Sequence, residues 1–181
     1  AMIQKNPGFV TFITDDDYRV RFALTFTPDG GHLYLKPDLD TGWKEFMRID
    51  PVDSMTTQSI GFDKTGNHYY ILDSRDRDKG ALKVVELETG CEKVLAESDL
   101  ADIDGVIVHP TEKTVQAVTF THARQHLKIL DSTIQSDIDY LETVADGELK
   151  ITSRTLDDRL WTVTFLVDDG PLRFYLYDRE A

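Results

Sequence analysis

The chain has 181 residues, of which 40% are hydrophobic and 10% aromatic, and its formal net charge is −13. This composition suits a single globular domain with a hydrophobic core and argues against a disordered segment. The negative charge argues against nucleic acid and anionic membrane surfaces as partners, because both are bound through clustered Lys and Arg. The sequence also lacks a run of about 20 apolar residues that could cross a membrane.

The single cysteine, Cys91, has no second cysteine with which to form a disulfide. It lies in a predicted turn without a histidine nearby, so we expect a structural thiol and not a nucleophile. The chain therefore does not depend on an oxidising compartment, and no signal peptide is visible. These features favour the cytoplasm as its location.

The first half of the chain predicts a series of short strands separated by turns. Residues 9–13 form a short apolar run, and residues 18–26 alternate between apolar and polar side chains, as a half-buried strand does. A turn rich in Pro, Asp and Gly follows at 27–31. Further strands are predicted at 33–35, 43–49, 58–62, 68–72, 82–87, 93–96 and 104–108.

A strand-turn-strand cassette recurs along the chain. Its turn positions, Asp63, Pro110 and Asp157, are about 47 residues apart, a period typical of propeller blades with several strands each. One late strand, residues 160–167, carries apolar residues on both faces, as a strand covered from both sides does. We therefore predict an all-β fold, a partial β-propeller of about four blades that occupies residues 1–181.

Residues 132–145 interrupt this pattern and predict one short inserted helix. Ser132 and Gln135 have the spacing of a capping box, and Gly147 is placed to end the helix. One face carries an apolar stripe at helical spacing, made of Ile134, Ile138, Leu141 and Ala145. We expect the helix to lie in a connection between strands and to pack this stripe on a sheet.

The motifs of hydrolytic chemistry are incomplete. None of the seven serines lies in the Gly-x-Ser-x-Gly turn that presents a hydrolase nucleophile. Two acidic pairs, Asp157-Asp158 and Asp168-Asp169, precede turns, where Asp bonds its own backbone. Glycosidase carboxylates instead face each other across a cleft. We therefore expect no catalytic residue in this chain.

Metal sites are also not expected. The acidic loop 73–80 does not place its carboxylates at the ligand offsets of a calcium loop, so exposed ion pairs are the better interpretation. His122 and His126 have the i, i+4 spacing of zinc ligands on a helix, but they lie in a predicted hairpin without a third ligand nearby. We expect neither a metal nor a cofactor.

Four arginines follow or end the second strand of their predicted blades. They are Arg75, Arg77, Arg124 and Arg154. Loops at this position crowd toward one rim of a propeller, where guanidinium groups could hold the carboxylate of a peptide or of a partner. Ion pairing with the many local Asp residues is the alternative, and we favour it.

The order and spacing of several motifs resemble a known family. Residues 61–67, 73–78, 152–161 and 169–179 together are similar to the propeller domain of prolyl oligopeptidase-type serine peptidases, and most similar to the acylaminoacyl-peptidase-like branch. The resemblance covers residues 18–179. In that family a propeller of about seven blades precedes an α/β-hydrolase domain that carries a Ser, Asp and His triad.

The resemblance implies a fragment from which the hydrolase domain is absent. Such a fragment would gate the active site and help to bind peptide substrates, and its partners would be those peptides and the missing domain. Its unclosed ends would expose apolar faces, so we also expect self-association. A self-sufficient propeller-like protein-binding module is an alternative, and a small hydrolase that uses Asp157 or Asp169 is another.

Overall fold

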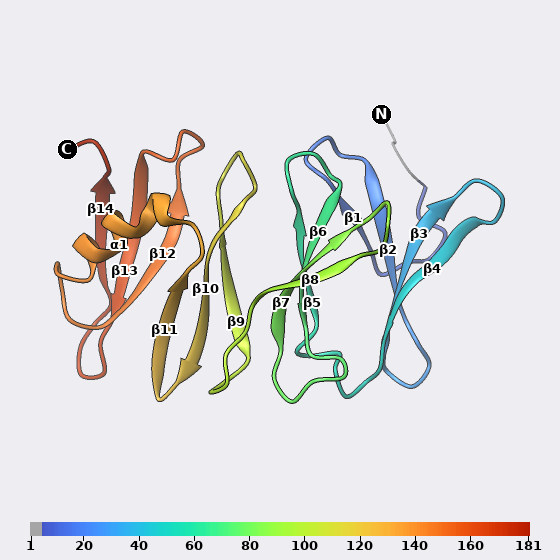
Figure 1. Ribbon diagram of the computed structural model, residues 1–181, viewed down its shortest axis with the longest axis horizontal. Coiled ribbons are helices and arrows are strands. Elements are labelled where there is room, and N and C mark those ends of the chain that lie inside the picture. Colours follow the sequence, from blue (N-terminus) through green and yellow to red (C-terminus); the bar gives the residue numbers. More distant parts are fainter. Residues whose placement is uncertain (1–4) are drawn as a thin grey trace. The chain divides into compact units, whose positions relative to one another are not determined.

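The computed structural model describes residues 5–181, and contacts divide the chain into two compact units that meet at Asp102 and Ile103. Both units consist of antiparallel sheets whose strands are joined to their neighbours in sequence (Figure 1). One short helical segment is the exception among the described residues. The prediction of an all-β fold with one inserted helix is therefore confirmed.

The first unit contains two four-stranded sheets, in which the strands follow each other in sequence order. One sheet consists of β1 (Thr11–Thr14), β2 (Val20–Phe26), β3 (His32–Asp38) and β4 (Gly42–Ile49). The other consists of β5 (Gln58–Phe62), β6 (His68–Asp73), β7 (Ala81–Glu86) and β8 (Glu92–Ala96). Each predicted strand of this region is present, with small shifts of its bounds.

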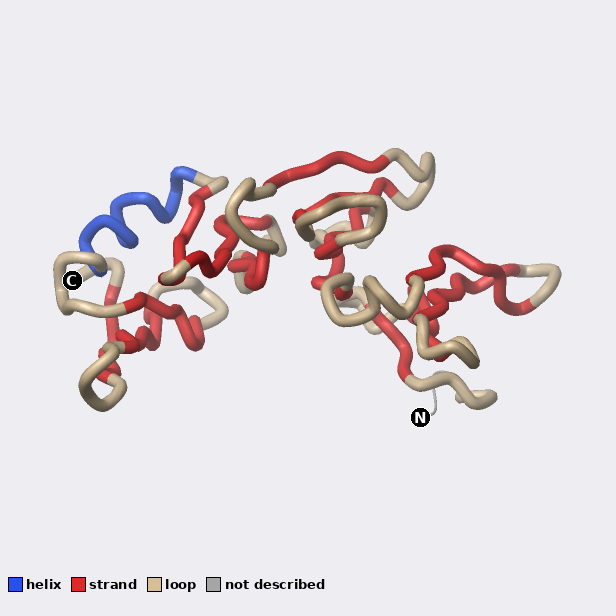
Figure 2. The backbone as a smooth tube through the Cα atoms, turned by 90° about the horizontal axis from the view of Figure 1, so that it is seen from below, coloured by secondary structure: helices blue, strands red, loops and turns tan. Residues whose placement is uncertain are grey.

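The second unit contains two three-stranded sheets. The first consists of β9 (Ile103–Val108), β10 (Val115–His122) and β11 (Arg124–Ile129). The second consists of β12 (Glu148–Arg154), β13 (Leu160–Leu166) and β14 (Arg173–Asp178). A 3-10 turn, η1 (Ser132–Ile134), and the helix α1 (Gln135–Leu141) connect the two sheets, and the helix lies along one side of the strands (Figure 2).

The helical segment begins and ends differently from the prediction. Asp131, and not Ser132, caps it, because the Asp131 carboxylate accepts a hydrogen bond of 2.9 Å from the backbone N–H of Thr133. Asp caps a helix as well as Ser does, and the tight first turn moves the free N–H groups within its reach. The α-helix ends at Leu141 and not near Ala145, because turns with i, i+3 hydrogen bonds follow it.

The apolar stripe of the helical segment packs on the sheet, as predicted. Ile134, Ile138 and Leu141 are 0%, 2% and 1% exposed. They form one hydrophobic cluster with residues of β10 and β13, which include Ala117, Trp161, Val163 and Phe165. The helix therefore covers one face of the last sheet and completes the core of the second unit.

The core of the first unit joins its two sheets face to face. Phe22 of β2 lies with its ring centre 5.6 Å from that of Phe62 and 4.9 Å from that of Tyr69, both in the second sheet. Ile49 and Ile71 are also fully buried in this cluster. These contacts come from alternate residues of each strand, as the period-two pattern predicted, although Tyr18 and Phe26, at the two ends of the alternating segment, are 74% and 56% exposed.

The first hairpins of three successive sheets share one backbone hydrogen bond. The backbone N–H of Asp63, His109 and Thr155 donates to the carbonyl five residues later, at 3.0, 2.8 and 3.0 Å. Within each of these turns one residue has a positive φ, and these residues are Gly66, Lys113 and Asp158. Gly adopts this conformation without strain, and Asp does so more readily than Lys. Within the described residues no sheet closes on itself, and the arrangement of the sheets as propeller blades stays a prediction.

The packing of α1 gives a first testable prediction. Replacement of Ile138 by Ala should lower the free energy of unfolding by about 2 to 5 kcal/mol, because it leaves a cavity in a fully buried cluster. The measurement is urea unfolding followed by circular dichroism. Ser136→Ala, on the exposed side of the same helix, is the matched control and should change stability little. A loss of less than about 1 kcal/mol for Ile138→Ala would mean that the helix is not part of the core.

Candidate functional site

The four arginines singled out by the sequence each have an acidic partner of their own. Arg75 pairs with Asp73 and Arg77 with Glu97 in the first unit. In the second unit Arg124 pairs with Asp168, and Arg154 with Asp158. Pairing with a local Asp, the favoured interpretation, describes Arg75 and Arg154, whereas Arg77 and Arg124 pair with acidic residues farther along the chain. A role in binding stays a prediction for all four.

Asp73 and its cations form a buried ionic group at the end of β6. Arg75 donates two hydrogen bonds to its carboxylate, at 2.9 and 2.8 Å, and Lys83 donates one at 2.9 Å. The Asp73 side chain is fully buried. Burial by itself would raise the pKa of this carboxyl, but the hydrogen bonds from Arg75 and Lys83 outweigh it and lower the pKa to about 2. Asp73 therefore stabilises the fold as a carboxylate, and Arg75 is part of that arrangement.

Arg154 belongs to a second buried ionic group, which we call the Asp158 cluster: Asp158, Arg154, Arg179 and Trp161. Only 7% of the Arg154 side chain and 4% of the Asp158 side chain are exposed. The Asp158 carboxylate accepts hydrogen bonds from both guanidinium groups and from the indole N–H of Trp161, the last at 2.9 Å. The two guanidinium carbons lie 4.6 and 5.0 Å from the centre of the Trp161 ring. The cluster is an enclosed structural group.

The sequence predicted that the side chains of Asp157 and Asp158 bond within a turn, and this is true only of Asp157. Asp157 does bond within the turn, accepting from the backbone N–H of Arg159 at 3.2 Å. Asp158 lies in the same turn, but its side chain points inward to Arg154 and Arg179. Arg179 also donates to Asp137 of α1 at 2.9 Å. Arg154, four residues before Asp158, and Trp161, three residues after it, were local signals, whereas Arg179 is 21 residues away.

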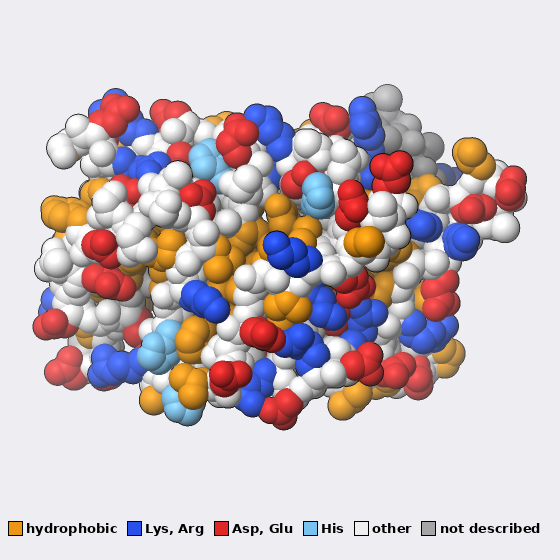
Figure 3. Space-filling model, in the orientation of Figure 1, with side chains coloured by type: hydrophobic (Ala, Val, Ile, Leu, Met, Phe, Trp, Pro, Cys, Tyr) orange, Lys and Arg blue, Asp and Glu red, His pale blue; other side chains and the backbone are white. Residues whose placement is uncertain are grey.

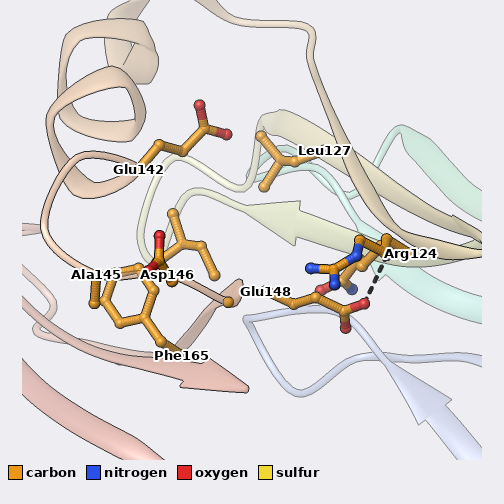
Figure 4. Close-up of a pocket in the computed structure, with 10 residues that line it drawn as sticks. Arg124, Leu127, Glu142, Ala145, Asp146, Glu148 and Phe165 are labelled. Carbon is orange, nitrogen blue, oxygen red and sulfur yellow. Dashed lines mark hydrogen bonds between the residues drawn. The ribbon is translucent and has the colours of Figure 1, made fainter. Parts of the chain in front are cut away.

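Arg124 lies at the rim of a pocket of about 270 Å³ in the second unit. Its side chain is 66% exposed, and it donates a hydrogen bond of 2.8 Å to Asp168, whose side chain is 83% exposed. Figure 4 shows Arg124 and Glu148 at one side of the pocket, opposite Ala145, Asp146 and Phe165. The pocket thus combines one exposed guanidinium group, several carboxylates and an apolar wall.

The hydrogen bonds around this pocket hold its polar side in place. Glu148, at the start of β12, accepts a hydrogen bond of 3.0 Å from the backbone N–H of Gln125 in β11. This bond ties the two sheets of the unit together beside Arg124. Glu142 and Asp146 come from the segment that follows α1. A small ligand with a carboxylate at one end and an amino group at the other would meet opposite charges here.

Other candidate positions for chemistry lie apart from one another. His122 and His126 are exposed at the β10–β11 hairpin, where the His126 ring lies 3.4 Å from the His122 backbone oxygen. Within residues 5–181 no group of three or more His, Cys, Asp or Glu side chains is placed to hold a metal ion.

In the described part of the chain no helix has the length and apolar character needed to cross a membrane. On the face drawn in Figure 3, Lys and Arg side chains are interspersed with Asp and Glu.

The buried Asp73 group gives a pH-dependent prediction. The pKa of Asp73 in the folded chain, about 2, lies below its ordinary value of 3.8. Its stabilising contribution, about 2 kcal/mol, is therefore complete above the ordinary pKa of 3.8 and is lost as the pH falls toward 2. Asp73→Asn should cost about this amount at pH 7 in urea unfolding and clearly less at pH 3. Asp78→Asn, which removes an exposed carboxylate beside Lys79, should match the parent at both pH values. An Asp73→Asn deficit that is the same at both would contradict this account.

Comparison with known proteins identifies relatives along the entire chain. No family model matches it. It is 33% identical over 182 residues to dipeptidyl aminopeptidase BIII of Pseudoxanthomonas mexicana, an alignment that covers 100% of the chain and 26% of the relative. It is also 33% identical over 188 residues to dipeptidyl peptidase family member 6 of Caenorhabditis elegans, covering 98% of the chain and 25% of the relative. The chain spans about a quarter of the length of these relatives. The resemblance to prolyl oligopeptidase-type peptidases is thereby confirmed, since the chain is homologous over nearly all its length to part of two dipeptidyl peptidases.

Proposed function

We propose that the chain is a non-catalytic β-propeller portion of a peptidase related to the dipeptidyl peptidases. In this proposal it limits access to the active site and helps to hold peptide substrates for a hydrolase domain elsewhere in a longer protein. The observation that carries the proposal is the identity of 33%, from one end of the chain to the other, to about a quarter of two such enzymes. The relatives' remaining length leaves ample room for a separate catalytic domain.

The architecture is compatible with this role. Each sheet contains strands in sequence order, as a propeller blade does. A hairpin closed by the same backbone hydrogen bond recurs in three successive sheets, at Asp63, His109 and Thr155, with the spacing of blade repeats. Blades arranged around an axis leave a channel that admits an extended peptide and excludes a folded protein. A propeller in front of an active site would therefore select substrates by size.

Arg124 is the best placed of the four arginines to hold a peptide. Its partner Asp168 is exposed, and an ion pair between exposed groups contributes less than about 1 kcal/mol. A peptide carboxylate can therefore replace Asp168 at little cost and accept two parallel hydrogen bonds from the guanidinium group. Arg75 and Arg154 are instead held by the buried carboxylates of Asp73 and Asp158.

The covalent chemistry belongs to the hydrolase domain in this proposal. Acyl transfer from a peptide to a serine needs a general-base histidine and an oxyanion hole beside that serine. The residues of this chain contribute binding and steric selection. Their contribution to the reaction would be to orient the peptide, which lowers the entropy cost of reaching the transition state.

Peptide binding at Arg124 can be tested on the isolated chain. Titration with the dipeptide Ala-Ala, followed by NMR, should shift the signals of Arg124, Gln125 and Glu148. The same dipeptide with a C-terminal amide should not do so, because it lacks the carboxylate. Arg124→Ala should abolish the shifts. Arg159→Ala, which removes another exposed arginine paired with an acidic residue, should leave them unchanged. Equal shifts with acid and amide would contradict the assigned role.

The proposal that catalysis lies outside this chain has a separate test. The isolated chain should hydrolyse Ala-Ala-4-nitroanilide no faster than a protein-free blank, and a fluorophosphonate probe for activated serines should leave it unlabelled. Either hydrolysis or covalent labelling of one of its serines would overturn the proposal that catalysis lies outside this chain. The dipeptide titration is independent of this outcome, because it measures binding alone.

A further inference from the structure

A second hollow lies beside the Arg124 pocket, between the two sheets of the second unit. Its volume is about 330 Å³, and it shares Gln125, Leu127 and Leu149 with the first pocket. One wall is a face of the sheet formed by β9, β10 and β11, and the other wall is β12 (Figure 1). Both sheets belong to the same compact unit, so the hollow is part of the packing of that unit.

The floor of the hollow contains a glycine and a β-bulge. Gly105 lies opposite Thr119 in the ladder between β9 and β10, and a Cβ atom at Gly105 would collide with the Thr119 hydroxyl oxygen. The preceding residue, Asp104, has no partner in this ladder, because the register shifts by one residue there. A bulge of this kind changes the face of the sheet to which a side chain points.

The bulge places the Asp104 carboxylate on the face that lines the hollow. One carboxylate oxygen accepts a hydrogen bond of 2.7 Å from the Thr119 hydroxyl, and the other accepts one of 2.7 Å from the Thr121 hydroxyl. A hydroxyl has one proton, and both protons are thus committed to the carboxylate. The two hydroxyl oxygens therefore face any further group as acceptors only. Among the described residues no cation forms an ion pair with Asp104.

Gln125 adds a buried acceptor that has no donor. It lies directly opposite Thr121 in the ladder between β10 and β11, and therefore on the same face. Its Oε1 atom is buried and receives no hydrogen bond from any described residue. A buried carbonyl oxygen without a donor is costly, so it favours a ligand that supplies one. The apolar part of the hollow is formed by Ile107, Leu127 and Leu149.

We propose that this hollow binds a primary ammonium group on an alkyl stem, as in a lysine side chain or a free alkylamine. An ammonium group has three N–H donors and no acceptor, so it matches oxygens that can only accept. The Asp104 carboxylate balances its charge, and one of its N–H groups supplies the hydrogen bond that Gln125 Oε1 lacks. The stem lies against the apolar wall. The net charge of −13 raises the local concentration of cations around the chain.

Two other occupants fit the hollow less well. Lys150 also lines it, but its neighbours Leu149 and Ile151 pack into the core, and alternation along β12 therefore directs the Lys150 side chain to the other face. A hard metal ion such as Ca²⁺ needs about six oxygen ligands or more, whereas much of this wall is apolar. The inference is independent of the proposed function, because Arg124 takes no part in it.

The first experiment is an NMR titration of the full chain with n-butylammonium chloride. We expect saturable shifts of the Gly105, Thr121 and Gln125 signals, with a dissociation constant of about 1 to 10 mM. Tetramethylammonium has the charge but no N–H, and alaninamide has an ammonium group without an alkyl stem, so neither should produce these shifts. No saturation by about 50 mM n-butylammonium, equal shifts with tetramethylammonium, or saturation by calcium chloride instead would overturn the proposal.

A second ligand separates the two sources of the ammonium group. Nα-acetyl-lysine amide presents it on a side chain and should shift the same signals. Tighter binding of this compound than of n-butylammonium assigns the site to a lysine of a peptide or protein, and weaker binding assigns it to a free alkylamine.

Variants test the two acceptors. Asp104→Asn removes the charge, and Gln125→Leu replaces the amide by an apolar group of similar size. Each should weaken n-butylammonium binding about tenfold or more, since each removes a hydrogen bond to a charged group. Asp40→Asn and Gln58→Leu make the same changes at exposed positions of the first unit and should bind as the parent does. Parent-like affinity in Gln125→Leu contradicts the assignment.

Thermal unfolding without ligand gives a readout that a purely structural glutamine would not produce. Gln125→Leu removes a buried oxygen that has no donor, so the melting temperature should rise by about 2 °C or more. The rise that n-butylammonium causes in the parent should be absent from this variant. A Gln125→Leu chain that melts below the parent would mean that Gln125 already has its partner within the fold, and the proposal would fail.

Discussion

Short antiparallel sheets cannot be stable unless each buries one apolar face, and this constraint organises both units. In the first unit the rings of Phe22, Phe62 and Tyr69 bring two four-stranded sheets together. In the second unit each sheet has only three strands, and the stripe of α1 supplies part of the missing cover. The helix is therefore a structural complement to smaller sheets.

Buried ion pairs fix the positions of particular side chains in both units. Asp73 and Asp158 each bind two cations at the end of a strand or in a turn, and each fixes an arginine that the sequence had offered as a binding residue. A buried carboxylate without its cations would be costly, so these arginines are committed to the fold. Arg124 differs because its partner is exposed. An arginine whose partner is buried thus stabilises the fold, whereas an arginine whose partner is exposed is available to a ligand.

The strands were predictable from the sequence because their signals are local. Alternation and turn residues located the predicted strands, and the apolar stripe located the helix and its buried face. The Asp158 cluster was only partly predictable, because Arg154 lies four residues before Asp158 but Arg179 reaches the cluster from the residues after β14. The cap at Asp131 was missed because Ser132 offered an equally good capping box. The pocket beside Arg124 depends on the spacing of two sheets and the end of α1, which no short motif encodes.

The position of the two tryptophans has a practical consequence. Trp43 lies half-buried in β4 of the first unit, stacked 6.0 Å from Phe12, whereas Trp161 is completely enclosed in the second. Each unit thus contains its own intrinsic fluorophore. The indole of Trp161 is fully buried beside two guanidinium groups and should emit at a shorter wavelength than the half-buried Trp43. Emission spectra recorded during denaturation would therefore reveal whether the halves of this polypeptide melt together or one after the other.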